Sequence, residues 1–176
     1  MLSLIQQATL QVRQANQDDV PSLVSIYNFE VVHGESNYES KLQPLEARAL
    51  WLDQVQSKQL PVIVVEKEGR VVGFGALTPF HTLSGYQKTV TGCLYVAAEV
   101  RGLGAGKLLA THLKREAELR GLHSIIAGVN SRNTTSIALL KTFGFRQVGY
   151  FKEIGQKNGQ WFDDVCLQLM LPKEKY

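Results

Sequence analysis

Two hydrophobic periods can be followed along the first third of the chain. Residues 10–15 alternate apolar and polar side chains, which is the period of a half-buried strand. The next segment carries apolar residues at helical spacing: Val20, Leu23, Val24, Tyr27 and Val31. Asp18 is placed to cap this helix, and Pro21 falls in its first turn. We expect a strand and then a helix, followed by a polar, irregular stretch over residues 33–43.

A second helix and a run of strands come next. Pro44 can open the helix, whose apolar face would consist of Leu45, Ala49, Leu52 and Val55. Residues 62–66 and 71–77 form the two arms of a predicted hairpin, because Gly69 between them accepts a turn conformation. A loop over 78–87 then leads to a central strand at 90–96.

The second half of the chain begins with a glycine-rich turn and continues as alternating helices and strands. The expected elements are a helix ending at Gly121, a strand at 124–129, a helix at 135–143, and strands at 145–154 and 161–171. A strand, a helix and a strand around the glycine turn make one parallel, right-handed βαβ unit. The predicted fold class is α+β: a mixed, mostly antiparallel sheet with helices on both faces, in a single domain spanning 1–176 with its core at about 10–171.

Composition and charge narrow the class of protein. Of 176 residues, 44% are hydrophobic and 20% are charged, as in an ordinary globular protein. The net charge is +3, without the dense basic stripe that nucleic-acid binders show. We therefore expect no nucleic-acid partner, whereas an anionic small molecule would suit a small positive excess.

Cysteine and histidine usage gives no sign of a disulfide scaffold or a metal site. Cys93 and Cys166 form no C-x-x-C pair, and the four histidines lack metal-ligand spacing. Residues 1–7 lack the basic start of a signal peptide, and no apolar run is long enough to cross a membrane. The expectation is a cytoplasmic protein without metal or membrane association.

The glycine-rich turn is the most informative segment, and its residues are Arg101, Gly102, Leu103, Gly104, Ala105, Gly106 and Lys107. A dinucleotide fingerprint, G-x-G-x-x-G, fails because Lys107 stands where its third glycine belongs. A Walker A loop fails because Arg101 replaces the first glycine and Leu108 the hydroxyl residue. The pattern that fits is Arg-x-x-Gly-x-Gly between a strand and a helix. Such a turn can bind phosphate through backbone N–H groups and the helix dipole, although a tight turn alone would also explain the glycines.

This turn resembles the acyl-CoA loop of the GCN5-related N-acetyltransferase superfamily. About 30 residues later, Asn133 and Ser136 open a helix that ends at Gly144-Phe145, and the superfamily has a similar segment near the pantetheine arm. The motif Lys157-x-Gly159-x-Trp161-x-Asp163 resembles the phosphinothricin and methionine sulfoximine N-acetyltransferase branch. The resemblance covers nearly the whole chain. It implies transfer of an acetyl group from acetyl-CoA to the amine of a small amino-acid-like substrate, in a homodimer.

The resemblance also implies roles for individual residues. Residues 101–107, Asn133 and Ser136 would bind acetyl-CoA together with the strand residues Leu94, Tyr95 and Val96. Tyr95 would in addition be a catalytic residue. The amine would attack the thioester directly while backbone N–H groups stabilise the developing oxyanion. The expected substrate-binding residues are Tyr38, Tyr86, Lys157, Trp161 and Asp163, although Lys157 and Asp163 could instead pair across a hairpin and Trp161 could pack in the core.

Three positions depart from the pattern of the branch. Thr91 stands where the branch has a glutamate base, and Leu140 stands where a histidine or tyrosine is usual. The loop at 80–86 lacks the arginines that bind a substrate carboxylate in related enzymes. His81 is a candidate base, because an unperturbed imidazole titrates near pH 6.5, but a solvated loop histidine is an equal alternative. The departures leave two further hypotheses open: an acyl-CoA-binding sensor that has lost catalysis, and an acetyltransferase that acts on protein amines.

Overall fold

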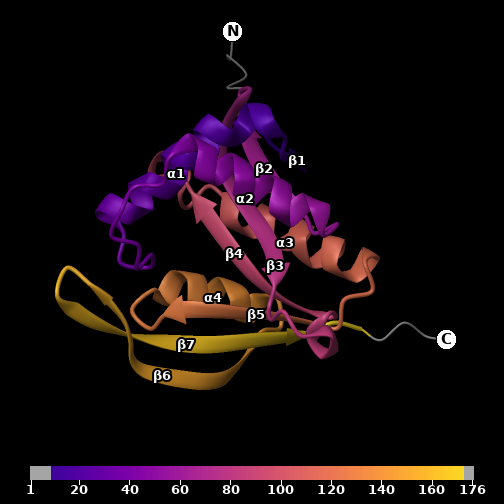
Figure 1. Ribbon diagram of the computed structural model, residues 1–176, viewed down its shortest axis with the longest axis vertical. Helices are drawn as coiled ribbons and strands as arrows, with labels where there is room; N and C mark the ends of the chain where they lie inside the picture. Colours follow the sequence, from indigo (N-terminus) through magenta and orange to yellow (C-terminus); the bar gives the residue numbers. More distant parts are fainter. Residues whose placement is uncertain (1–8, 173–176) are drawn as a thin grey trace, which may run out of the picture.

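The protein is built on one mixed sheet of seven strands, seen in a computed structural model that describes residues 9–172. The strands are β1 (Leu10–Gln14), β2 (Val62–Lys67), β3 (Arg70–Pro79), β4 (Thr89–Val96), β5 (Ser124–Asn130), β6 (Arg146–Lys157) and β7 (Gln160–Met170). Their order across the sheet is β1-β2-β3-β4-β5-β7-β6 (Figure 1). Residues 1–7, for which we expect no signal peptide, lie outside the described range.

Helices cover both faces of this sheet, as the sequence predicts (Figure 1). The helices are α1 (Val20–His33), α2 (Leu45–Ser57), α3 (Ala105–Leu119) and α4 (Thr134–Thr142), and short 3-10 turns occupy Gln17–Asp19, Ser84–Tyr86 and Ala98–Val100. The first two helices pack on one face of the sheet, and α3 and α4 pack on the other. Within the described range no helix is long and apolar enough to cross a membrane.

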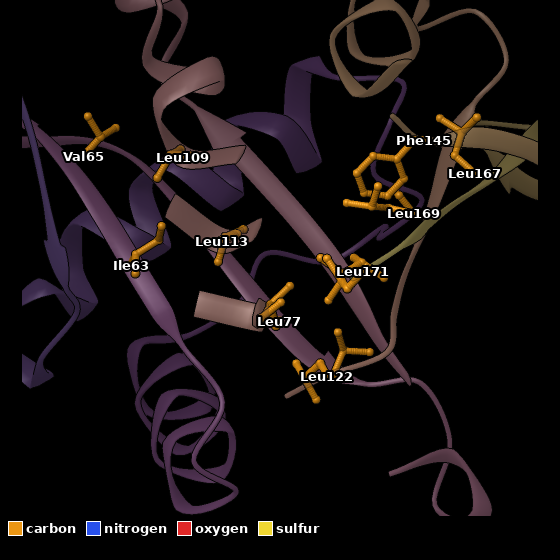
Figure 2. Close-up of a cluster of buried hydrophobic side chains, with 14 of the residues drawn as sticks. Ile63, Val65, Leu77, Leu109, Leu113, Leu122, Phe145, Leu167, Leu169 and Leu171 are labelled. Atoms are coloured by element: carbon orange, nitrogen blue, oxygen red, sulfur yellow. The ribbon is translucent and has the colours of Figure 1, made fainter. Parts of the chain in front are cut away.

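The larger core lies on the α3 side of the sheet. Figure 2 shows its labelled side chains extending from Ile63 and Val65 of β2 to Phe145 and Leu167, with Leu109 and Leu113 of α3 between them. All of these side chains are buried. This apolar layer fixes α3, and therefore the glycine turn at its start, against the middle of the sheet.

Two expected local features differ from the structure. The cap of the 3-10 turn before α1 involves the side chains of Asn16 and Asp19 and not that of Asp18. Asn16 Oδ1 accepts a hydrogen bond from Asp18 N, and Asp19 Oδ2 accepts one from Asn16 N. On α2, Leu45 is 49% exposed and Arg48 is buried. The Arg48 guanidinium lies 4.0 Å above the Tyr27 ring, so aromatic faces stabilise this cation inside the core.

The short pairing between β4 and β5 decides where a ligand can enter. The strands β4 and β5 are parallel, but they pair over only three residues, ending at Thr91 and Ile126. Beyond these residues β4 stays paired with β3, and β5 stays paired with β7. The two strands therefore diverge (Figure 1), and the edge of β4 from Gly92 to Val96 that faces β5 is left without a partner strand.

Candidate active site

A cavity of about 850 Å³ opens where β4 and β5 diverge. This volume is within the range of about 300–1,000 Å³ that ligand pockets usually have. Its walls are β4 from Gly92 to Val96, β5 from Ala127 to Asn130, the glycine turn and the first turns of α3 and α4. The cavity therefore joins the glycine turn, at one end, to the unpaired backbone edge of β4.

The glycine turn forms a cradle of backbone at the mouth of the cavity. Gly102 has φ +75° and Gly104 has φ +93°, and at both residues an added Cβ would meet nothing within 4 Å. The first bond within α3 joins Leu108 N to Gly104 O at 3.0 Å, so the preceding N–H groups have no partner inside the helix. Open backbone donors at a helix N-terminus suit a phosphate. The residues present thus fit the pyrophosphate of acetyl-CoA.

The sequence-predicted cofactor residues lie around this cradle, with two exceptions. The cavity lining includes Leu94, Tyr95, Val96, Arg101, Gly102, Gly104, Gly106, Lys107, Asn133 and Ser136. Leu103 points outward with 56% exposure, and Ala105 is buried in the core instead. Arg101 is held by an ion pair with Glu30 of α1 and donates from Nε to the Val96 carbonyl at 3.2 Å. The expected helix cap is present, since Asn133 Oδ1 accepts from Ser136 N at 3.0 Å.

Tyr95 lies inside an aromatic group on the α1 side of β4. Its ring centroid is 5.0 Å from that of Phe74 and 5.2 Å from that of Tyr27. Burial of the phenol raises the pKa of Tyr95, and the neighbouring Cys93 and Tyr27 add to this effect. The Tyr95 hydroxyl therefore stays protonated near neutral pH and is available as a neutral donor.

The segment of residues 34–43, which we call the 34–43 loop, follows α1 and is hydrogen-bonded to side chains of β5, β6 and β7. Lys157 Nζ donates to three backbone carbonyls, those of Glu30 (3.2 Å), Gly34 (2.6 Å) and Asn37 (2.8 Å). Asn130 of β5 donates to the Glu35 carbonyl at 2.9 Å. These bonds hold the loop beside the opening between β4 and β5.

Tyr38 anchors the same loop by packing flat on β6. Its ring is stacked on Phe162 at 5.7 Å, and its hydroxyl donates to Asp164 Oδ1 at 2.5 Å. A Cβ on Gly155 would overlap the ring, with Cδ2 at 2.5 Å and Cζ at 2.9 Å. Only glycine at position 155 allows this close approach of the ring to the strand.

Replacing Gly155 with alanine is expected to destabilise the protein by about 1–3 kcal/mol, because the new methyl group must displace the Tyr38 ring. For a chain of this length that lowers the melting temperature by about 2–12 °C. Thermal denaturation followed by circular dichroism measures the change. Gly85→Ala is the matched control, because nothing lies within 4 Å of a Cβ there. Equal melting temperatures for the two variants would contradict the packing described for Tyr38.

Several predicted site residues have other partners or lie elsewhere. The Thr91, His81, Tyr86 and Trp161 side chains are not in the cavity lining, and Trp161 is 53% exposed. His81 accepts from Leu83 N through Nδ1 at 3.1 Å, within an exposed turn. Lys157 and Asp163 are not paired: Lys157 holds the carbonyls of the loop, while Asp163 accepts bonds from the Tyr150 hydroxyl and Glu153 N.

Sequence reasoning missed three polar residues of this region: Glu30, Asn130 and Asp164. The first two line the cavity, and Asp164 bonds to Tyr38. One signal was available for Asp164, because an acidic side chain in the middle of the strand predicted at 161–171 needs a polar neighbour. No such signal exists for Glu30, which lies on a helix where glutamate is common.

Comparison with known proteins decides the family. The model of the acetyltransferase (GNAT) domain matches residues 12–166. The chain belongs to the GNAT acetyltransferase family. It is 31% identical over 160 residues to the L-methionine sulfoximine/L-methionine sulfone acetyltransferase of Salmonella typhimurium, covering 91% of this chain and 94% of that one.

Solved GNAT structures have the same architecture. The phosphinothricin acetyltransferase from Sinorhizobium meliloti in complex with acetyl-CoA is 30% identical with a TM-score of 0.90, over 93% of this chain and 89% of that chain. The ribosomal-protein-alanine N-acetyltransferase from Brucella melitensis is 37% identical with a TM-score of 0.90, over 92% and 99%. The mixed sheet with one parallel pair and helices on both faces is therefore the GNAT fold, and acetyl-CoA is the acetyl donor of this enzyme.

Proposed function

We propose that this GNAT enzyme acetylates the primary amine of a small amino-acid-like substrate of the methionine sulfoximine or phosphinothricin type. The observation that supports the proposal is the continuous cavity from the glycine cradle to the unpaired edge of β4. The names of the Salmonella and Sinorhizobium relatives support this substrate class.

The residues that line the cavity have two proposed tasks, which are to hold acetyl-CoA and to stabilise the developing oxyanion. Gly102, Gly104, Gly106 and Lys107 would hold the pyrophosphate, and Asn133 and Ser136 would flank the pantetheine. The backbone of Leu94, Tyr95 and Val96 would bind the pantetheine and the thioester carbonyl. Each well-placed donor to a developing oxyanion typically contributes about 3–4 kcal/mol. Arg101 would support the cradle through its ion pair with Glu30.

Thr91 would occupy the position of the usual base without replacing its chemistry, because a hydroxyl cannot take the proton of an ammonium. Lys157 and Tyr38 would act on the substrate side by holding the 34–43 loop. We assign no substrate contact to His81, Tyr86, Trp161 or Asp163. The first three side chains are exposed to solvent, and both oxygens of Asp163 are bonded on β6, to Tyr150 and Glu153 N.

We also propose that the protein is a homodimer and that it acts in the cytoplasm. Edge strand β6 and the start of β7 expose large apolar side chains, which are Val148, Tyr150, Phe151, Ile154 and Trp161. Patches of this kind are typical of protein interfaces. Acetyl-CoA is made and used inside cells, which supports the cytoplasm. Light scattering coupled to gel filtration measures the oligomeric state, and a monomer at micromolar concentration would contradict the dimer.

The test of the function is a transfer assay. The protein is incubated with acetyl-CoA and a panel that contains L-methionine sulfoximine, L-methionine sulfone, phosphinothricin, ordinary amino acids and polyamines, and free thiol is followed. We expect turnover on the first three compounds. Tight acetyl-CoA binding without turnover on any amine would overturn the proposal and favour an acyl-CoA sensor.

A second candidate function is acetylation of a protein N-terminus. The name of the Brucella relative and its 37% identity to this chain favour it. An alanine-starting peptide belongs in the same panel, and turnover on the peptide with none on the free amino acids would select this candidate.

A further inference from the structure

The carboxylate of Asp164 lies on the substrate side of the sheet. On β7 the alternate residues Val165 and Leu167 point into the core on the α3 side. Asp164 therefore points to the opposite face, where Tyr38 of the 34–43 loop donates to its Oδ1 at 2.5 Å. Its strand partner is Asn130, a residue of the cavity wall.

The second oxygen of this carboxylate lies beside a glycine of the cavity wall, whereas Asp164 itself is not among the residues that line the cavity. Gly128 of β5 is exposed and lines the cavity. A Cβ placed on Gly128 would have Asp164 Oδ2 as its nearest neighbour, at 3.8 Å. Among the hydrogen bonds of residues 9–172, none reaches Oδ2. Because position 128 carries no side chain, this residue of the cavity wall does not cover the free carboxylate oxygen.

Asp164 is held in this orientation by neutral groups. Burial of the Tyr38 phenol, and then its hydrogen bond to Asp164, raise the pKa of Tyr38, so the phenol remains a donor. The Tyr38 ring is in turn fixed by Phe162 and by the close approach to Gly155. A neutral donor orients the carboxylate without cancelling its charge.

The other carboxylates at the cavity are already paired with arginines. Glu30 forms its ion pair with Arg101, and Glu35 lies 3.8 Å from Arg132. The nearby cation Lys157 has its ammonium bonded to backbone carbonyls of the 34–43 loop. Of the carboxylates discussed, Asp164 is therefore the one that has no arginine partner and keeps a free oxygen beside the cavity wall.

We propose that Asp164 binds the ammonium group of the acceptor and takes its proton, replacing the base that is absent at Thr91. This rests on the proposed function and adds a catalytic residue to it. The carboxylate gains one proton and the ammonium becomes a neutral amine. Its nitrogen then attacks the acetyl carbonyl carbon, the C–N bond forms and the C–S bond breaks. The sulfur leaves with the electron pair of the C–S bond. The attacking nitrogen then loses a second proton, which the thiolate takes up to give free CoA, and Asp164 later releases the first proton to water.

The test compares Asp164→Asn with the wild type, using L-methionine sulfone as the acceptor. We expect kcat to fall about 10²–10⁴-fold at pH 7, which is the usual contribution of a general base. The defect relative to wild type should shrink at least tenfold by pH 9.5, because most of the free amine is then already neutral. Acetyl-CoA affinity, measured by calorimetry, should change less than twofold. Affinity of the enzyme–CoA complex for L-methionine sulfone at pH 7 should fall at least tenfold.

Two further variants make the experiment specific. Gly128→Val leaves the carboxylate intact but covers Oδ2, and it should reproduce the loss of turnover with acetyl-CoA binding preserved. Asp53→Asn removes an exposed carboxylate of α2 that accepts a hydrogen bond from Gln17. This variant should behave as wild type. If Asp164→Asn retains kcat within threefold, or shows the same defect at pH 7 and pH 9.5, the proposal is wrong. If the wild type acetylates no amine in the panel, the proposed function fails instead.

Discussion

Gly104→Val is expected to weaken acetyl-CoA binding by at least 100-fold. Gly104 has φ +93°, a region that β-branched residues avoid, and it starts α3 with its Cα open to the cavity. A valine there would strain the turn and place methyl groups where the pyrophosphate approaches the backbone. Isothermal titration calorimetry with acetyl-CoA measures the loss.

Gly69→Val is the control that separates the effect of backbone strain from the effect of losing the phosphate cradle. Gly69 has φ +74° and nothing within 4 Å of an added Cβ, but it lies in the β2–β3 turn, outside the cavity lining. Both variants should lose about 1–3 kcal/mol of stability from backbone strain. Only Gly104→Val should lose affinity. An affinity within threefold of wild type for Gly104→Val would refute the assignment of the cradle.

Asp19→Asn is expected to destabilise the protein by about 2–3 kcal/mol, less than breaking a fully buried ion pair costs, because the Arg13 side chain is 39% exposed. Asp19 is 5% exposed and receives two bonds from the Arg13 guanidinium, at 2.7 and 2.8 Å. Arg13 keeps its second partner, Glu66, which limits the loss. Chemical denaturation gives the free energy of unfolding, and the melting temperature should fall by about 4–12 °C.

Asp18→Asn is the control on the neighbouring residue, which is exposed and whose side chain makes no described bond. It should change stability by less than about 0.5 kcal/mol. The pH dependence supplies a second check. Burial acts to raise the pKa of Asp19, but hydrogen bonds from Arg13 and Asn16 N outweigh it and lower the pKa from 3.8. The carboxylate therefore stabilises the fold above pH 3.8, and this contribution disappears as the pH falls through the lowered folded value.

The sequence predicts those parts of the fold that depend on local rules. Hydrophobic periods located the helices and strands within a few residues, and the glycine turn and the Asn133 cap follow from backbone chemistry. The cap before α1 was assigned to Asp18, whereas the side chains of Asn16 and Asp19 form it, because a short 3-10 turn that the hydrophobic pattern does not predict precedes the helix. Likewise, Arg48 on α2 is buried because three aromatic rings from separate segments surround it.

Most residues that line the cavity near the glycine turn could be predicted from the sequence, whereas the contacts of the 34–43 loop could not. Residues 94–107 are one continuous segment, and residues 133–136 open the next helix after α3. Two short linear motifs therefore describe them. The substrate half depends on where β4 and β5 stop pairing, which leaves no mark in the residues themselves. Lys157 is the clearest case: the motif marked it as important, but its three carbonyl partners lie at the end of α1 and in the 34–43 loop, more than a hundred residues away.

This separation along the chain has a kinetic consequence. The bonds that fix the 34–43 loop connect residues 126 positions apart for Tyr38 and Asp164, and 120 apart for Lys157 and Asn37. Contacts across such distances carry a large loop-closure entropy, and they form after local structure. The acetyl-CoA cradle should thus assemble early during folding, and the substrate wall last. In a partly unfolded enzyme the cofactor half would persist after acceptor binding is lost, giving a protein that still holds its donor but no longer transfers the acetyl group.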